Sequence, residues 1–341
     1  MIPNGYLLYR LVTSILGDER TGYILRSLAI EPRLLTVSDA LNRAQIATAL
    51  NAVLFSELLE RVPTADEYVA RSVGAGRTVS FDHGALRTID GSTGDGFSSG
   101  GPPGIAAFAR ILEPLGYAQV GTYPLPKLHM TGHAFAHRDF AESVPQFFVS
   151  ELHVAQLPEA ARLAARRVFG NSVDPLGEAE HAALGLLARD GHCPLELAMA
   201  ALPGLVRAFG RHHAPPALAD YEILLAHSPE AAWIATEGQA FNHATDRVAD
   251  VAALAAELLE RGMPLKPKIE VSANGRVRQT AFLAAKVRRQ FRVGDGSLIE
   301  REVPGSFFEF ISRDVDPATG RIDLSFDSGN ATGIFAVTSA Q

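Results

Sequence analysis

The segment that most constrains the fold begins at Phe241, where the sequence Phe-Asn-His-Ala-Thr-Asp places His243 directly before a helix. Apolar residues at helical spacing predict this helix from about Val248 to Glu260, and Gly262 ends it. The later segments have the composition of strands, and the last one, Phe-Phe-Glu-Phe-Ile, sets Glu309 between large apolar side chains. A strand with a histidine, a helix and several strands ending with a glutamate indicate a βαβββ module that can hold a metal.

The first half of the chain repeats this order of elements. A strand carries His83, a helix is predicted over 105–115, and three strands follow with the sequences YAQVGTY, HMTGHAFAHR and QFFVSELHV. The separation of His83 and Glu151 along the chain nearly equals that of the histidine and glutamate in the second half, which indicates an internal duplication. When the two Phe-Phe pairs are aligned, Glu151 lies two positions beyond the equivalent of Glu309. It can therefore share the inward face of the sheet.

We expect one compact α+β unit with N-terminal helices (1–75), a first metal-binding module (76–157), a helical insertion (158–237), and a second module with the tail (238–341). The two modules are expected to form a curved sheet around the metal. A long helix follows Ser38, which is predicted as its N-cap. Segment 91–104 is rich in Gly, Ser and Pro but lacks the ending of a phosphate-binding loop, which favours a flexible loop or lid. No linker-like composition isolates the insertion, so it is expected to pack on the sheet.

Composition and charge exclude several classes of protein. A hydrophobic content of 47% and a charged content of 20% are typical of a globular chain, and the net charge of −7 gives no reason to expect nucleic acid or a membrane as partner. The single Cys193 excludes an internal disulfide framework and leaves only histidine and carboxylate ligands for a metal. No signal peptide or bilayer-length apolar run is present, so a cytoplasmic location is expected. The oligomeric state stays open.

His83, His243 and Glu309 are the candidate metal ligands. Two imidazoles and one carboxylate leave about half of an octahedral coordination sphere open, which suits an Fe(2+) ion that must bind both a substrate and dioxygen. Arg87 follows His83 by four residues and returns to the same strand face, where it can clamp a substrate carboxylate or form a surface salt bridge. Gln279 lies in a later strand and is predicted to contact the substrate, although strand alternation also allows it to face solvent.

The main rival metal cluster is formed by His129, His133 and His137. Their spacing of four places them on one face of either a helix or a strand, but no patterned carboxylate accompanies them. Nucleophilic hydrolysis is poorly supported, because the chain has no Gly-x-Ser-x-Gly elbow and Cys193 has no evident partner.

Several motifs together carry a family resemblance. FDHGALRT with FNHAT, KPKIEVS with NGRVRQTA, and FFEFISR resemble the 2-oxoadipate dioxygenase/decarboxylase (2-hydroxyglutarate synthase) family, whose iron-dependent enzymes are distant relatives of the vicinal-oxygen-chelate, glyoxalase-like proteins. The resemblance runs from about residue 5 to the tail. It implies that His83, His243 and Glu309 bind iron and that Arg87 is the catalytic arginine that binds the substrate.

The same resemblance implies a reaction. A 2-oxo dicarboxylic acid and dioxygen would be the small-molecule partners, and 2-oxoadipate would be decarboxylated and hydroxylated to 2-hydroxyglutarate in lysine catabolism without an organic cofactor. Two alternatives stay open at this point. One is a glyoxalase-like lyase or isomerase with a closed-shell metal and Glu151 as fourth ligand. The other is a metal-free binding protein whose inward histidines are only hydrogen-bonded.

Overall fold

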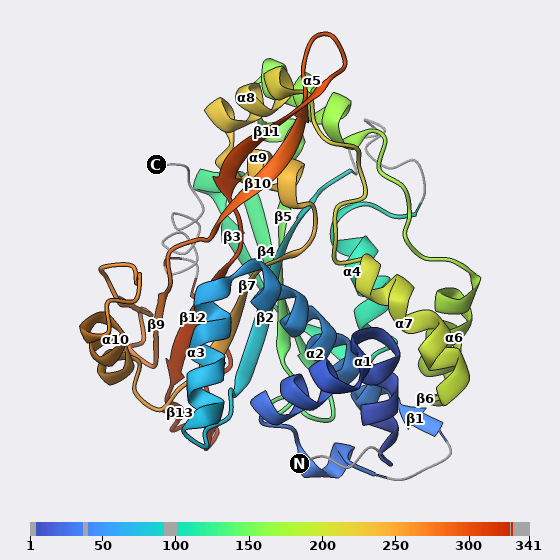
Figure 1. Cartoon of the computed structure of the whole chain (residues 1–341), viewed down its shortest axis with the longest axis vertical. Coiled ribbons are helices and arrows are strands. Elements are labelled where there is room, and N and C mark those ends of the chain that lie inside the picture. Colours follow the sequence, from blue (N-terminus) through green and yellow to red (C-terminus); the bar gives the residue numbers. More distant parts are fainter. Residues whose placement is uncertain (1–4, 37–39, 92–100, 328, 330–341) are drawn as a thin grey trace.

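A strongly curved sheet of eight strands forms the centre of the molecule (Figure 1). The computed structural model describes residues 5–36, 40–91, 101–327 and 329. The strand order is β3-β4-β5-β2-β7-β12-β9-β8. The bounds are β2 Phe81–Ile89, β3 Tyr117–Leu125, β4 Met130–His137, β5 Gln146–Leu152, β7 Phe241–Arg247, β8 Glu270–Val271, β9 Val277–Ala281 and β12 Phe307–Arg313.

The sheet consists of two modules with the same topology. Strands β2 and β7 begin the two modules and pair antiparallel at the centre, while β5 runs parallel to β2 and β12 runs parallel to β7. In each module a helix follows the first strand, α4 (Gly104–Leu112) in the first and α10 (Val251–Glu260) in the second. The predicted pair of βαβββ modules is therefore confirmed. The second module carries an additional hairpin, β10 (Lys286–Arg292) and β11 (Leu298–Pro304), which projects from one end of the molecule (Figure 1).

The N-terminal helices are α1 (Leu7–Ser27), α2 (Arg43–Arg61) and α3 (Pro63–Gly74). Helices α2 and α3 lie against one face of the sheet, and α1 packs on these two helices (Figure 1). Helix α1 contains a kink at Gly17, whose φ of 72° is left-handed and favours glycine. The start predicted for α2 was wrong. Ser38 lies outside the described residues, but Ala40–Asn42 forms strand β1, which pairs with β6 (His192–Pro194). Asn42 then caps the helix in a reciprocal pair with Gln45, which satisfies two backbone N–H groups.

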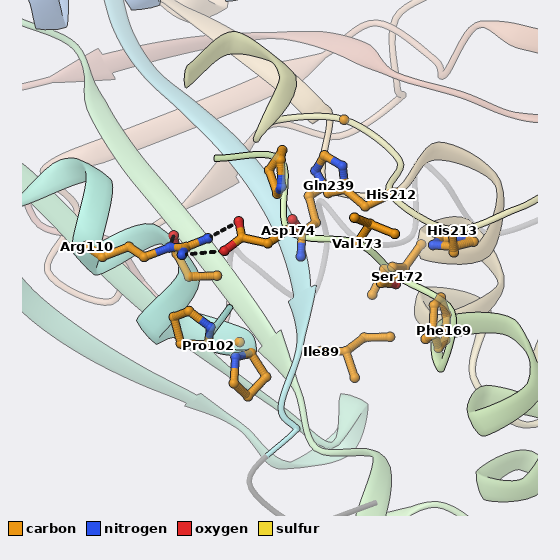
Figure 2. A pocket seen from close by; sticks show the side chains of 17 residues that line it. Ile89, Pro102, Arg110, Phe169, Ser172, Val173, Asp174, His212, His213 and Gln239 are labelled. Atoms are coloured by element: carbon orange, nitrogen blue, oxygen red, sulfur yellow. Dashed lines mark hydrogen bonds and ion pairs between the residues drawn. The ribbon is translucent and has the colours of Figure 1, made fainter. Parts of the chain in front are cut away.

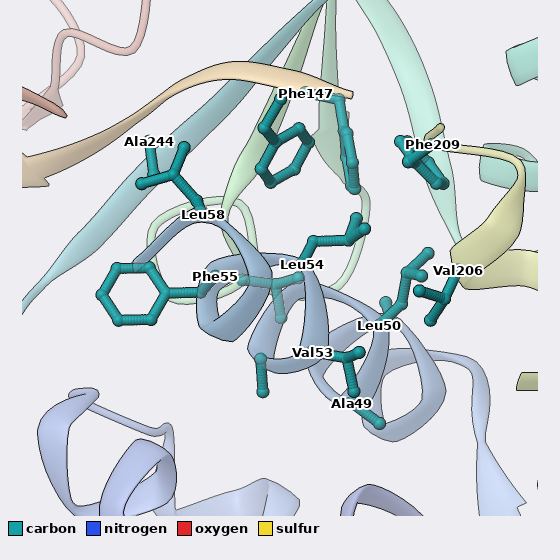
Figure 3. Packing of buried hydrophobic residues seen from close by; sticks show 14 of the residues in the cluster. Ala49, Leu50, Val53, Leu54, Phe55, Leu58, Phe147, Val206, Phe209 and Ala244 are labelled. Carbon is teal, nitrogen blue, oxygen red and sulfur yellow. The ribbon is translucent and has the colours of Figure 1, made fainter. Parts of the chain in front are cut away.

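Helix α2 fills the space under the centre of the sheet (Figure 3). Leu50, Leu54 and Leu58 are buried there with Phe147 of β5 and Phe209. A buried leucine or phenylalanine side chain contributes about 1.5–3 kcal/mol through the hydrophobic effect, so this layer stabilises the centre of the sheet.

The central strand pair approaches so closely that one position requires glycine. A Cβ atom at Gly84 in β2 would lie 2.2 Å from the ring of Phe241 in β7. Because side chains alternate along β2, Gly84 and Leu86 face the helices, while His83 and Ala85 face the concave side.

The helical insertion consists of α5 (Glu159–Phe169), α6 (Glu178–Asp190), α7 (Leu195–Arg207), α8 (Leu218–His227) and α9 (Pro229–Glu237). Helix α7 packs with the N-terminal helices, whereas α5, α8 and α9 share a second apolar cluster with Ile89 and Leu152 of the sheet and Phe291 of the hairpin. Helices α5, α8 and α9 thus pack on the sheet as expected for the insertion, whereas α6 and α7 do not. The exact residue bounds of the four predicted parts stay a prediction.

Two further short strands, β13 (Val315–Asp316) and β14 (Arg321–Ile322), pair with each other near the C-terminus. Most of the predicted loop or lid at 91–104, and the final strand predicted in the tail, lie outside the described residues. In the part of the chain that the structure describes, no helix is both long enough and apolar enough to cross a membrane.

Candidate metal centre

Three adjacent strands bring His83, His243 and Glu309 together on the concave side of the sheet. The Nε2 atom of His243 lies 3.4 Å from Nε2 of His83 and 3.4 Å from Oε2 of Glu309. Metal–ligand bonds of about 2.0–2.2 Å place neighbouring donor atoms about 3.0 Å apart at an octahedral ion and about 3.3–3.6 Å apart at a tetrahedral one. The observed spacing therefore fits one divalent cation, and all three side chains are buried.

Burial controls the protonation of this trio. It raises the pKa of Glu309 well above its usual value, with the charge of Lys266 acting in the opposite direction. It lowers the pKa of His243 well below its usual value, and the positive charges of His83, Arg87 and Lys266 act in the same direction. Among the described residues, the one basic side chain within 4 Å of the Glu309 carboxylate is His243, and the lowered pKa of His243 leaves that imidazole uncharged. Neutral imidazoles beside a buried carboxylate that lacks a basic partner are a donor set that a divalent cation would satisfy.

Asp82 fixes the orientation of the His83 ring. Its Oδ1 atom lies 2.8 Å from Nδ1 of His83, which leaves Nε2 directed at the other two candidate ligands. Arg313 at the end of β12 donates to both oxygens of Asp82 at 2.9–3.1 Å, and the two side chains are 0% and 1% exposed. Although burial opposes it, the Arg313 guanidinium and the bond to His83 hold the pKa of Asp82 below its usual value.

Sequence reasoning did not identify this supporting pair. The available signal was an aspartate directly before the histidine of β2 and an arginine directly after the apolar run of β12. The pairing of two residues 231 positions apart could not be read from either strand alone.

The trio opens on a pocket of about 450 Å³. Gln279 lines this pocket, so it faces the concave side as predicted, although contact with a substrate stays a prediction. Glu270 in the neighbouring strand instead pairs with Lys266. The remaining lining residues are Ala85, Phe148, Ser150, Asn242, Phe326 and Asp327.

A larger cavity of about 630 Å³ lies elsewhere, between the start of α4 and the helical insertion (Figure 2). Its main charged groups, Arg110 and Asp174, neutralise each other through hydrogen bonds of 2.6 and 2.8 Å. None of the three candidate ligands lines it, so the smaller pocket is the candidate active site.

The C-terminal tail forms one wall of the candidate active site. The ring of Phe326 packs edge-on against His83 at 4.9 Å between centroids and also contacts Phe148. Arg313 holds this segment by donating to the carbonyl oxygens of Asp323 and Ser325 at 2.9 and 2.8 Å. The sequence predicted only a strand and a turn here, because no local pattern shows that a tail returns to the centre of a sheet.

Arg87 is buried beside the pocket and does not line it. Its guanidinium lies 2.9 Å from Oε2 of Glu230 in α9 and 4.7 Å from the ring centre of Trp233. The side chain is 1% exposed, so the alternative of a surface salt bridge is wrong. Arg87 and His83 lie four residues apart in β2, so both side chains project from the same face of that strand. Sequence reasoning missed Glu230, which comes from the helical insertion.

The rival ligands do not join this centre. His129 lies beside Gln156 and His137 packs against the ring of Tyr117, so the three evenly spaced histidines do not converge. Glu151 points to the opposite face of the sheet, where it accepts the N–H of Ile105 at 2.7 Å. The inward orientation considered for Glu151 was therefore wrong, because Phe148 and Ser150 occupy the concave face of β5.

Two βαβββ modules around a buried pair of histidines and a glutamate define a glyoxalase-like protein of the vicinal-oxygen-chelate type. A glyoxalase superfamily protein from Ralstonia eutropha JMP134 has the same fold, with a TM-score of 0.89, 47% identity, and coverage of 94% of this chain and 98% of that one. Within this class, the sequence profile described as 2-oxoadipate dioxygenase/decarboxylase matches residues 45–322. The chain belongs to that family.

More distant solved structures share the fold. Hydroxyglutarate synthase from Oryza sativa, in complex with 2-oxoadipate, has a TM-score of 0.67 and 21% identity, and the match covers 87% of this chain and 93% of that one. The Pseudomonas putida hydroxyglutarate synthase, also in complex with 2-oxoadipate, has a TM-score of 0.57 and 19% identity, with coverage of 89% and 74%. No curated protein matches the sequence.

Proposed function

We propose that the protein is a cytoplasmic iron(II)-dependent dioxygenase that converts 2-oxoadipate and dioxygen into 2-hydroxyglutarate and carbon dioxide, a step of lysine catabolism. The observation that carries the proposal is the buried trio of His83, His243 and Glu309, which faces a pocket in a member of the 2-oxoadipate dioxygenase/decarboxylase family. Two solved proteins of similar fold contain bound 2-oxoadipate, which supports the choice of substrate.

The trio supplies the ligands for the metal. Nε2 of each histidine and a carboxylate oxygen of Glu309 would hold the ion, and burial keeps the His243 imidazole neutral for this purpose. When bound, iron(II) supplies the redox chemistry and open positions for the 2-oxo acid and dioxygen. The reaction balances, because a six-carbon oxo acid and dioxygen yield a five-carbon hydroxy acid and carbon dioxide.

The residues around the trio determine the shape of the pocket and limit the access of water. Phe148 and Phe326 form apolar walls beside the metal position, which excludes water from the reaction. Asn242 and Gln279 offer amide groups to the polar ends of a substrate, and the side-chain oxygen of Asn242 is buried without a hydrogen-bond partner among the described residues. These contacts would fix which carbon of the substrate faces the oxidant.

Arg87 is the candidate partner for a substrate carboxylate, and Glu230 controls its availability. The pair is buried, so a substrate carboxylate that approaches Arg87 brings a second negative charge into a site already neutralised by Glu230. Burial raises the pKa of Glu230. Glu230 can therefore take up a proton when the substrate binds, which releases Arg87 to form a charge-assisted hydrogen bond with the substrate.

Oxygen consumption tests this function. The purified chain, loaded with iron(II) under argon, is mixed with aerated buffer containing one of a panel of 2-oxo acids. We expect 2-oxoadipate to drive uptake of one dioxygen for each carbon dioxide and each 2-hydroxyglutarate formed. A zinc- or nickel-dependent turnover without oxygen uptake would instead support the lyase or isomerase alternative. No described residue favours that alternative, because Glu151 faces away from the trio.

A further inference from the structure

A second group of metal-ligating side chains lies on the other face of the first module. Asp90 follows β2, while Glu151 and His153 lie at the end of β5. One donor atom from each of the three comes within 4.8 Å of the others, and Nδ1 of His153 lies 3.4 Å from Oδ2 of Asp90. This separation equals the separations within the first trio. The group is independent of the proposed oxygenase function, because none of its members lines the candidate active site.

His133 of β4 points toward the same place. Its Nε2 atom lies 4.0 Å from Oε2 of Glu151 and is buried without a hydrogen-bond partner among the described residues, while its Nδ1 atom lies 3.2 Å from Nε2 of Gln119. Of the three histidines with a spacing of four, this one alone joins a carboxylate cluster.

Neighbouring groups already orient the potential donors. Thr131 Oγ1 lies 2.8 Å from Nε2 of His153, so the other ring nitrogen is directed at Asp90. The N–H of Ile105 donates to Oε1 of Glu151, which leaves Oε2 on the side of His133. In metal sites, the ring nitrogen or carboxylate oxygen of a ligand that does not bind the metal typically forms a hydrogen bond of this kind.

We propose that Asp90, Glu151, His153 and His133 form a second metal site for a zinc-type divalent cation. Two carboxylates and two imidazoles suit zinc and similar transition ions better than calcium or magnesium, which prefer oxygen ligands alone. Bond lengths of about 2.0–2.2 Å place neighbouring donor atoms about 3.3–3.6 Å apart, so Asp90 and His153 already have this spacing, whereas Glu151 and His133 would move closer to them when the ion binds. The ion would join the ends of β2 and β5 to β4, next to the start of α4, and would have a structural role.

Metal content of the full chain tests this proposal. The His243→Ala variant removes one ligand of the first trio, so that binding elsewhere can be counted. Apo protein is dialysed against zinc or cobalt(II), and bound metal is measured by mass spectrometry together with the visible absorption of cobalt. We expect His243→Ala to retain one ion per chain. Adding Glu151→Gln and His153→Ala to this variant should abolish the remaining binding.

A matched control separates this site from casual binding to surface histidines. His192 is exposed, and its Nδ1 atom lies 3.1 Å from the backbone oxygen of Asp190, so His243→Ala with His192→Ala should retain the ion. Thermal unfolding supplies a second readout: zinc should raise the melting temperature of His243→Ala by several degrees, and it should not change that of the triple variant. Circular dichroism checks that the triple variant is folded.

Two results would overturn the proposal. One is a His243→Ala protein that binds no zinc or cobalt. The other is retention of the ion when Glu151 and His153 are replaced, which would place it elsewhere. If the triple variant does not fold, His153→Ala alone decides the matter, because it should lose one of the two ions of the otherwise unaltered chain while oxygen consumption is unchanged.

Discussion

Replacement of Asp82 by asparagine tests the support of the metal centre most sharply. Asp82 accepts the Nδ1 hydrogen of His83 and neutralises Arg313, which is wholly buried. The asparagine keeps the size of the side chain but removes its charge. Loss of one partner of a buried ion pair costs about 3–5 kcal/mol of folding stability, because the other charge stays buried without compensation. Loss of a ligand-orienting group costs about 10–100-fold in metal affinity.

A double variant separates these two effects. Asp82→Asn with Arg313→Met removes both charges, so part of the lost folding stability should return, although the bonds from Arg313 to the carbonyl oxygens of Asp323 and Ser325 stay lost. Metal affinity should stay low, because His83 is still not fixed. Iron(II) or cobalt(II) titration gives the affinity, and urea unfolding gives the stability. Asp314→Asn is the matched control, since it breaks an exposed pair with Arg278 that contributes at most about 1 kcal/mol. Unchanged metal affinity in folded Asp82→Asn protein would refute a positioning role for Asp82.

Three further predictions follow from the site. His83→Ala or Glu309→Gln should lower 2-oxoadipate turnover by more than about 100-fold, because loss of a metal ligand has a larger effect than loss of a residue that only orients a ligand. Near-normal turnover by either iron-loaded variant would contradict the assignment of these residues as metal ligands. In the unaltered chain, KM for 2-oxoadipate should rise with pH, because proton uptake by Glu230 becomes harder. In Glu230→Gln this KM should depend less on pH, and KM for a monocarboxylic oxo acid should differ little from that of the unaltered chain. Burial raises the pKa of Asp246 to about 6, so ionisation of this group should lower the free energy of unfolding by about 2–3 kcal/mol as pH rises from about 4 to 6. Urea unfolding of Asp246→Asn should show no such loss from this position.

The arrangement of the sheet could be predicted because it depends on local signals. Strand alternation, two helices at equivalent places and two similar separations between histidine and glutamate indicated two modules. Alternation left both faces open to Gln279, and only the folded sheet shows that it lies on the concave side. Helix starts were less certain, since Ser38 and Asn42 are both good caps. The pairing of β1 with β6, which lies far along the chain, decides in favour of Asn42.

The electrostatic partners in the site could not be predicted, because they meet only in the folded chain. Arg313 reaches Asp82 from the far end of the sequence, and Glu230 reaches Arg87 from the helical insertion. The alignment of the Phe-Phe pairs misplaced Glu151, since the equivalent strands differ in register: Gly84 pairs with Phe147, whereas the second histidine pairs with Phe307. A shift of one residue in a strand exchanges its two faces.

Product labelling under oxygen-18 gas tests the proposed dioxygenase reaction most directly. Iron(II)-loaded protein is supplied with 2-oxoadipate and labelled dioxygen, and 2-hydroxyglutarate is analysed by mass spectrometry. A dioxygenase places both atoms of one dioxygen molecule in the organic product, one in the new carboxylate and one in the hydroxyl group. We predict that the product contains two oxygen-18 atoms. Unlabelled product, or equal turnover without oxygen, would contradict the proposed reaction.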